Sequence, residues 1–298
     1  MPATENPHTT AFLEYIQYQK RYSRHTLTSY QADLLQFEAY LKSQFETGDL
    51  QVATSAMIRS WLAELKEDKN DSRTINRKIS TLKSFYKFLI RQKVIATTPM
   101  TVIISPKSGK KLPSFLAENE MVELMQNLEQ PESWQSLTNS LVIKLFYLTG
   151  MRVSELVGLK ENQLDLPAGQ VKVLGKGNKE RIIPISPELV FGLKAYLAEK
   201  PVRLAGIEAV FITEKGKPLS PRYVYGFVNR YLGAVTTLQK KSPHVLRHTF
   251  ATHLMNKGAE LNAVKELLGH TSLAATQVYT HNTIDKLKEV YKKAHPKA

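Results

Sequence analysis

Apolar side chains recur at intervals of three and four residues through the first hundred positions, which is the spacing of one buried helix face. One such stretch follows Ser23, a residue suited to capping a helix, and its apolar members are Leu27, Tyr30, Leu34, Phe37 and Leu41. Another begins near Ser72, also suited to an N-cap, and runs to about Lys93, with the apolar members Ile75, Ile79, Leu82, Tyr86 and Leu89. With a further helix predicted over 55–67, we expect an all-helical region over 9–98.

After residue 114 the pattern becomes mixed. The expected elements are helices over 120–128 and 136–148 and strands over 170–174, 181–185 and 209–213. Gly150 tolerates the left-handed conformation that ends many helices, and the first two strands flank the turn GKGNK as in a β-hairpin. From Ser220 onward the pattern is helical almost throughout. The fold class predicted from these elements is mainly α with a small β-sheet.

A break in the pattern separates these two regions. The stretch SPKSGKKLP contains proline, glycine and lysine, which interrupt regular structure and favour solvent. We therefore place a linker at 104–113, between an N-terminal helical domain of 1–103 and a second domain of 114–298. A chain of 298 residues is long enough for two domains, because single hydrophobic cores stop growing near this size.

Charge narrows the class of partner. Lysine and arginine total 41 against 27 acidic residues, which gives a formal net charge of +14. Such a charge attracts polyanions such as nucleic acid, and the alternative is a basic surface that only keeps the protein in solution. The chain has no cysteine, which excludes disulfides, thiolate nucleophiles and cysteine-bound zinc. Without a signal core or an apolar run of bilayer length, we expect a cytoplasmic protein with no membrane partner.

The predicted helix from residue 72 to residue 93 carries basic side chains and no acidic one. Exposed helices normally mix charges, because opposite charges at i and i+4 stabilise each other. One-signed charge therefore favours a surface that meets DNA, and a basic face in solvent is the alternative. Together with the lysines of the linker, the candidate DNA-binding residues are Arg73, Arg77, Lys78, Lys83, Lys87, Arg91, Lys107, Lys110 and Lys111.

Side chains that can bind phosphate gather in the second domain. A Ser-Pro pair before His244 marks a helix start, which puts His244 and Arg247 on one face of the first turns, where free N–H groups favour an anion. Arg152 follows a Gly-Met turn, and Glu155 could hold its guanidinium or a second basic group. The alternatives are a packed histidine and ordinary arginine–carboxylate pairs.

Three further candidates lie at turns or near a helix end. Lys176 occupies the tip of the hairpin between two glycines, where a flexible ammonium can reach a phosphate. Its surroundings lack the spacing of the nucleotide-binding loop GxxxxGK[ST], and a plain exposed turn is the alternative. His270 follows a glycine at a helix junction, and Tyr279 lies near the end of the next helix. Taken singly, such a tyrosine is usually a packing residue.

Histidine spacing also raises the question of a metal site. Five of the eight histidines fall between 244 and 281, and His244 and His248 are four residues apart. However, position 245 is valine, so the zinc motif HExxH is not formed, and no acidic residue lies between 216 and 259 to complete a ligand set. We therefore expect no metal and no cofactor.

The candidates occur in a fixed order, within the segments TGMRVSEL, GKGNKER, HVLRHTFATHL and LGHTSLAATQVYTH. Their order and context resemble the tyrosine recombinase family, most closely its Xer type, whose pattern is Arg, Lys, His-x-x-Arg, His or Trp, then Tyr. The resemblance covers nearly the whole chain, and the final HPKA favours the XerD type over the XerC type. It implies a C-shaped clamp of a helical SAM-like core-binding domain and a mixed α+β catalytic domain.

The resemblance also implies roles for the candidates. Tyr279 would attack the scissile phosphate and form a 3′-phosphotyrosyl link, and Lys176 would protonate the leaving 5′-oxygen. The side chains that would bind the non-bridging oxygens are Arg152, Arg247 and His270. His244 would assist proton transfer to or from the tyrosine, and Glu155 would support the site.

The function implied in this way is site-specific DNA recombination without metal or ATP, which resolves chromosome dimers at a dif-like site during segregation. The implied partners are a double-stranded core site, a sister Xer recombinase and a DNA-translocase activator. The protein would form a homo-tetramer, or a hetero-tetramer with the sister recombinase, in which the segment at about 283–298 docks on a neighbouring protomer. The alternatives are an integrase of a phage or mobile element, a type IB topoisomerase and a non-catalytic DNA-binding regulator. The short region before the linker disfavours integrases with an additional arm-binding domain.

Overall fold

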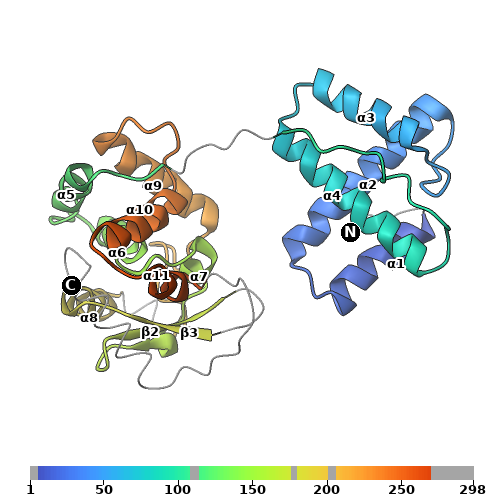
Figure 1. Cartoon of the computed structure of the whole chain (residues 1–298). Helices are drawn as coiled ribbons and strands as arrows, with labels where there is room; N and C mark the ends of the chain where they lie inside the picture. Colours follow the sequence, from blue (N-terminus) through green and yellow to red (C-terminus); the bar gives the residue numbers. More distant parts are fainter. Residues whose placement is uncertain (1–5, 108–113, 176–179, 201–205, 270–298) are drawn as a thin grey trace. The chain divides into compact units, whose positions relative to one another are not determined.

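The computed structural model of the protein describes residues 6–107, 114–175, 180–200 and 206–269. It divides into two compact units, Met1–Lys111 and Leu112–Ala298 (Figure 1). Each unit has a hydrophobic core of its own. The first unit is helical, and the second combines helices with a small sheet, which confirms the expected fold class.

The N-terminal unit is a helical bundle. Its elements are α1 (Pro7–Glu14), the π-helical turn η1 (Tyr15–Gln19), α2 (Arg24–Phe45), α3 (Ser55–Glu67) and α4 (Ser72–Arg91). The predicted apolar stripes of α2 and α4 meet in its core, where Leu34, Phe37, Leu82 and Tyr86 are fully buried. Burying a large apolar side chain contributes roughly 1.5–3 kcal/mol, so these stripes account for the packing of the two helices.

Helix starts in this unit follow the capping chemistry of the sequence, with one correction. Ser23 caps α2 by accepting a hydrogen bond from the Thr26 backbone N–H at 3.3 Å. Helix α4, however, is capped by Asp71 and not by Ser72, because the Asp71 carboxylate accepts from the Thr74 N–H at 2.6 Å. A carboxylate at this position also complements the positive end of the helix dipole.

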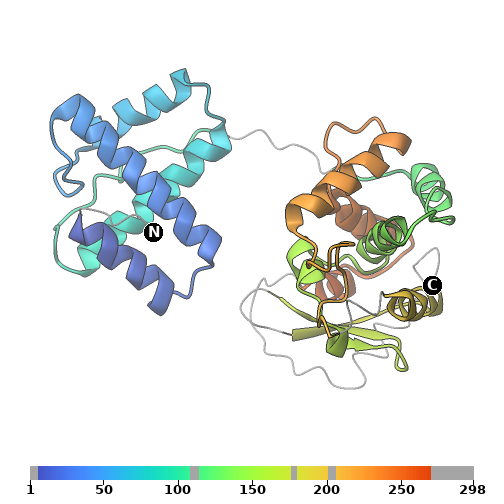
Figure 2. The same ribbon diagram turned by 180° about the vertical axis from the view of Figure 1, so that it is seen from behind.

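The C-terminal unit begins with helices and continues into the sheet. Its elements are α5 (Glu118–Gln126), α6 (Trp134–Thr149), α7 (Val153–Val157), η2 (Glu161–Gln163), β1 (Leu164–Asp165), β2 (Gln170–Leu174), β3 (Glu180–Pro184), α8 (Pro187–Glu199), α9 (Pro221–Val235), α10 (Pro243–Asn256) and α11 (Leu261–Leu268). Helix α6 is buried along most of its length and packs against α8, α9 and α10. Both views show α6 and α10 side by side (Figures 1 and 2).

The sheet is antiparallel, in the order β1-β2-β3. The hairpin of β2 and β3 confirms the strands predicted on either side of GKGNK. The third strand predicted over 209–213 is wrong. This β-branched and aromatic run forms only isolated bridges, Lys160 to Ala209 and Ile212 to Pro218, because its apolar side chains are buried in the core without a neighbouring strand to pair with. The third strand of the sheet is β1 instead.

Within the described part of the chain, no helix is both long and apolar enough to span a membrane. The longest helix, α2, carries charged residues along its length and packs one face against the N-terminal core. The apolar α6 is shorter and is enclosed by the other helices of its unit. Both helices are therefore accounted for by the cores of the two units.

Candidate active site

The site is built around the end of α6. Gly150 ends this helix in the left-handed conformation, with φ of 60°, as predicted. A Cβ at Gly150 would lie 2.5 Å from Cδ1 of Phe250 in α10 and 2.8 Å from Cδ2 of Leu268 in α11. Glycine is therefore required twice over, for its backbone angle and for the close approach of two helices. This contact brings α6, α10 and α11 together at one point.

Arg152 and Glu155 follow directly. Arg152 is the N-cap of the short helix α7, and the Glu155 carboxylate reaches back to accept its backbone N–H at 2.7 Å and its Nη1 at 2.9 Å. A third of the Arg152 side chain is exposed, whereas that of Glu155 is only 2% exposed. Arg152 is thus held from below by a buried carboxylate while its outer part meets solvent.

Arg181, at the start of β3, is the second partner of Glu155. Its Nη1 and Nη2 donate to the two carboxylate oxygens at 2.7 and 2.9 Å, a bidentate pair that is almost completely buried. Burial alone would raise the pKa of the Glu155 carboxyl, but the hydrogen bonds and charge of Arg181, followed by those of Arg152, lower that pKa below its ordinary value. Glu155 is therefore an anion at neutral pH.

Arg247 enters from the first turns of α10. Its Nη1 donates to the Gly150 carbonyl at 2.5 Å and its Nη2 to the Leu268 carbonyl at 2.6 Å. Burial lowers the pKa of Arg247 to about 10, and the positive charges of Arg152 and Arg181 act in the same direction, although Glu155 opposes them. The guanidinium remains charged at neutral pH, so a buried positive charge sits where α6 ends.

The last turn of α11 is held by all three arginines. Arg181 Nε donates to the Leu267 carbonyl at 3.0 Å, Arg247 Nη2 to that of Leu268, and Arg152 Nη2 to that of Gly269 at 3.2 Å. The final carbonyls of a helix have no partner within the helix and form its negative end. Three guanidinium groups therefore bind the end of the helix that immediately precedes residue 270.

His244 lies at the N-terminus of α10, one turn before Arg247, and is exposed at the surface. Partial desolvation lowers the pKa of His244, and the positive charges of Arg247 and Arg152 lower it further. The imidazole is therefore neutral at pH 7 and has a ring nitrogen that can accept a proton. The expected helix start is confirmed, with Ser242 at the N-cap and Pro243 in the first turn.

Together these groups form a site for an anion. Two guanidinium groups bind one carboxylate and that of Arg247 lies within reach of its charge, which leaves an excess of two positive charges next to a neutral histidine. Arginine forks match the oxygens of a phosphate, and charge-assisted hydrogen bonds of this kind are among the strongest in proteins. The arrangement can bind a phosphodiester and offset the charge that develops when it is attacked.

The structure brings four of the predicted site residues into this cluster: Arg152, Glu155, His244 and Arg247. The other three, Lys176, His270 and Tyr279, lie outside the described residues. Arg181 was not among the predicted residues. Its signal was present in the sequence of β3, because Arg181 and Ile183 are buried on the same face of the strand and an arginine there needs a buried partner.

The basic face of α4 consists of side chains that are exposed at one side of the helix: Arg73, Arg77, Lys83, Lys87 and Arg91. At 100° per residue they fall within an arc of roughly 120°. Lys107 is also exposed, and Lys110 and Lys111 lie outside the described residues. The expectation that Lys78 faces DNA is wrong, because Lys78 is buried on the other side of α4, over the ring of Trp61 at 5.6 Å.

The anion that compensates part of this charge comes from α2. Asp33, with a side chain only 1% exposed, accepts from Lys78 Nζ at 3.0 Å and from the Thr81 hydroxyl at 2.8 Å, and it forms an ion pair with Arg77. Lys78 also donates to Gln36. The absence of an acidic residue within α4 is therefore explained partly by a buried acid on the neighbouring helix.

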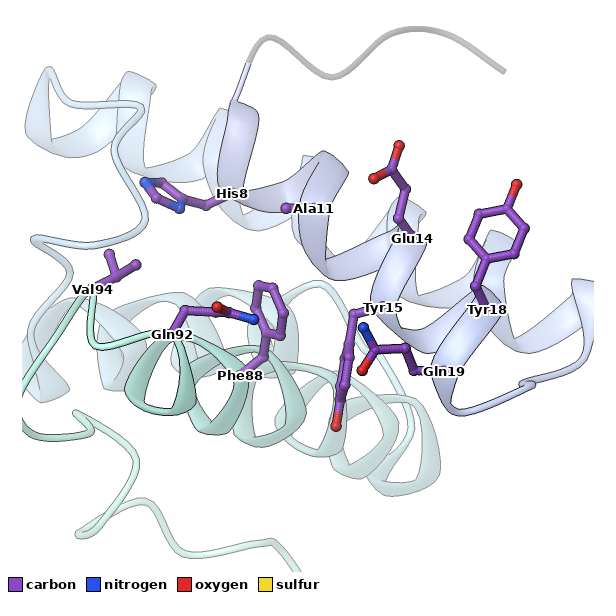
Figure 3. Close-up of a pocket in the computed structure, with 9 residues that line it drawn as sticks. All are labelled: His8, Ala11, Glu14, Tyr15, Tyr18, Gln19, Phe88, Gln92 and Val94. Atoms are coloured by element: carbon purple, nitrogen blue, oxygen red, sulfur yellow. The ribbon is translucent and has the colours of Figure 1, made fainter.

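A pocket of about 530 Å³ lies in the N-terminal unit, between α1, η1 and the end of α4 (Figure 3). Tyr15, Phe88 and Gln92 form part of its lining. No residue of the arginine cluster or of the basic face lines it, although Arg91 touches its edge by donating to the Tyr15 hydroxyl at 2.9 Å. The pocket is therefore separate from the chemistry described above.

Known proteins share both units. Residues 114–286 match the phage integrase family, and residues 9–93 match the N-terminal SAM-like domain of phage integrases. The tyrosine recombinase XerC of Halalkalibacterium halodurans is 40% identical over 298 residues, covering 97% of each chain. The chain belongs to the tyrosine recombinase family. It is accordingly an enzyme of the class that cleaves and rejoins DNA through a tyrosine.

Other tyrosine recombinases agree with this placement. The XerC of Chlorobaculum parvum is 36% identical over 314 residues, covering 96% of this chain and 94% of the relative. These relatives carry the XerC name, so the expected preference for the XerD type is not confirmed.

Solved tyrosine recombinase structures have the same fold. The pre-cleavage complex of XerH with its difH substrate has a TM-score of 0.68 and 25% identity, over 94% of this chain and 83% of that one. The Tn1549 transposon integrase in complex with transposon right-end DNA has a TM-score of 0.70 over 95% of this chain and 98% of that one. At 18% identity the second likeness concerns the fold alone.

Proposed function

We propose that this tyrosine recombinase acts on double-stranded DNA at a specific core site and resolves chromosome dimers at a dif-like site during segregation. Its XerC relatives and the DNA-bound XerH structure support this substrate and this class of site. The name of these relatives also favours the XerC role over the XerD role.

The observation that carries the proposal is the net positive cluster of arginines at the end of α11, next to a neutral histidine. Arg152 and Arg247 donate to the non-bridging oxygens of the scissile phosphate, together with His270. Binding is strongest in the transition state, when negative charge on these oxygens is greatest. His270 and Tyr279 follow α11 in the sequence, so the cluster adjoins the part of the chain that carries the nucleophile.

The reaction needs two proton transfers. The Tyr279 oxygen forms a bond to phosphorus while its proton passes to the neutral imidazole of His244. The bond from phosphorus to the 5′-oxygen breaks, and Lys176 gives that oxygen a proton. Religation reverses these steps, with a 5′-hydroxyl attacking the phosphotyrosyl ester. Since the ester conserves the energy of the phosphodiester, the cycle requires no ATP.

DNA is held in addition by the N-terminal unit. The basic face of α4 and the lysines at 107, 110 and 111 neutralise backbone phosphates, which gives affinity without reading sequence. We further propose that four protomers, alike or shared with a sister Xer recombinase, assemble on two duplexes and exchange the segment at about 283–298. A DNA-translocase activator acts on this assembly.

The experiment that tests this function is a search for the covalent intermediate. A core site is first selected from randomised duplexes by binding to the protein, and a nicked form of that site is then incubated with protein in EDTA. Denaturing gels should show a protein–DNA adduct for the wild type and none for Tyr279→Phe, with unchanged DNA binding in the variant. An adduct that persists in Tyr279→Phe, or relaxation of plasmid DNA without site preference, would contradict the proposal.

A further inference from the structure

Arg181 is a charged residue that cannot itself bind the substrate. Its side chain is 5% exposed and lies behind Glu155 and beneath the last turn of α11. A charge this deeply buried is costly unless specific partners compensate it. Arg181 has such partners: Nη1 and Nη2 donate to Glu155, and Nε donates to the Leu267 carbonyl.

Glu155 determines how much of the Arg152 charge reaches a phosphate. The carboxylate accepts from Arg152 twice, from its backbone N–H and from Nη1, and from Arg181 twice. If Arg181 were absent, Arg152 would be the main counterion of a buried carboxylate. Its guanidinium would then be drawn toward Glu155, and the net charge of the cluster would fall by one. With Arg181 in place, Glu155 is neutralised from the buried side.

Arg181 also links Glu155 to α11. A Cβ on Gly269 would lie 3.1 Å from Cδ and Nη1 of Arg181, so the guanidinium rests directly against this glycine, whose φ is 62°. The Gly269 carbonyl in turn accepts from Arg152 Nη2 at 3.2 Å. The same arginine therefore contacts both groups that orient Arg152, the carboxylate and the end of the helix.

We propose that Arg181 is a positioning residue for strand cleavage: it neutralises Glu155 and supports the end of α11, so that Arg152 directs its charge to the scissile phosphate. This inference rests on the proposed function, since it assigns Arg152 to that phosphate. Arg181 does not touch DNA. Its removal should therefore slow the chemical step and leave the affinity for DNA unchanged.

The test compares Arg181→Met and Arg181→Lys with Lys172→Met, which removes an exposed lysine from the neighbouring strand β2. Single-turnover cleavage of the nicked core site is measured at saturating protein, and the Kd for the same DNA is measured separately. We expect Arg181→Met to cleave about 30-fold more slowly and Arg181→Lys about 10-fold more slowly, with Kd changed less than about twofold. The Lys172→Met variant should match the wild type.

A second substrate separates positioning from general damage to the fold. A methylphosphonate at the scissile position carries no negative charge, so its cleavage depends less on the charge of Arg152. The defect of Arg181→Met should shrink from about 30-fold to about threefold on this substrate, whereas a misfolded variant would lose the same factor on both. If Arg181→Met fails to unfold cooperatively, the comparison is made with Arg181→Lys, which retains the charge.

The outcomes are distinct. Wild-type cleavage rates in both Arg181 variants, or an equal defect on both substrates, would overturn the positioning role and leave the proposed function intact. A wild-type protein that forms no adduct with its selected site would overturn the proposed function, and the inference with it.

Discussion

Each unit of this recombinase contains a carboxylate that is almost fully buried and bound by two cations. In the N-terminal unit, Asp33 binds Arg77 and Lys78 and so joins α2 to α4. In the catalytic unit, Glu155 binds Arg152 and Arg181 and so joins α7 to β3. The composition is the same, one acid and two bases, but the surroundings of the two clusters differ.

Around Asp33 the other partners are the Thr81 hydroxyl, the Gln36 side chain and the Ser29 carbonyl, which accepts from Arg77 at 3.4 Å, and the cations complete a packed helix pair. Around Glu155, both arginines also donate to backbone carbonyls at the end of α11, and Arg247 adds a third positive charge. The excess charge is therefore one near Asp33 and two near Glu155. The first cluster stabilises a helix pair whose outer face is basic, and the second concentrates charge at one point, as phosphate chemistry requires.

The largest expected effect is a loss of cleavage rate when an arginine of the catalytic cluster is removed. Arg247→Ala should reduce the single-turnover cleavage rate by about 10³-fold, because it removes a donor to the transition state and leaves the Gly150 and Leu268 carbonyls without that donor. Arg73→Ala, on the basic face of α4, should cleave at the wild-type rate once the DNA is saturating. If the cleavage rates of the two variants fell by the same factor, the proposed difference between the catalytic cluster and the basic face of α4 would be contradicted.

The two carboxylates themselves give the sharpest test. Asp33→Ala and Glu155→Ala should each lower the free energy of unfolding by about 3–5 kcal/mol, because each leaves buried cations without their acid. Glu188→Ala, which removes the exposed acid of a 3.7 Å pair with the partly buried Lys144, should change it by less than about 1 kcal/mol. Urea titration measures these values.

Activity should separate the same two variants. At a temperature where both remain folded, Glu155→Ala should lose cleavage at saturating DNA and Asp33→Ala should retain it. Equal loss of cleavage in both would mean that the catalytic cluster has only a structural role.

A moderate effect is expected from pH. Because the pKa of His244 lies below its ordinary value, the imidazole accepts the tyrosine proton above that pKa and loses this ability as the pH falls through it. The cleavage rate should therefore be half-maximal below about pH 6.5 and fall about tenfold per unit under that point. The His244→Gln variant should cleave more slowly than the wild type, and its cleavage rate should not fall with pH in this range. DNA binding through α4, which has arginine and lysine only, should show no such transition.

The smallest effect concerns a single cation of the basic face. Lys87→Gln should reduce the slope of log Kd against log salt by about one and weaken binding a few-fold at physiological salt. Lys78→Gln should leave that slope unchanged while lowering stability, because Lys78 is buried against Asp33. A loss of slope in Lys78→Gln would place this lysine on the DNA surface after all.

Much of the fold could be predicted because it depends on local periodicity. The bounds of α3 and the burial of the stripe on α4 follow from apolar spacing alone. The same spacing identifies the misplaced lysine: counted at about 100° per residue, Lys78 lies near the buried stripe and away from the other cations. The wrong strand over 209–213 had the right composition, but it meets its neighbours only through isolated bridges, and strand pairing is a property of two segments.

The sequence by itself determines the order and types of the candidate residues, the helix starts before Arg24 and His244, and the turn at Gly150. Capping, glycine conformation and motif spacing act over a few residues and therefore need no tertiary contact. Only the tertiary structure decided that Arg181 joins Glu155, and that three arginines bind the end of α11. These contacts link residues 21 to 117 positions apart. The charge excess at the site is therefore set by which helices and strands pack together.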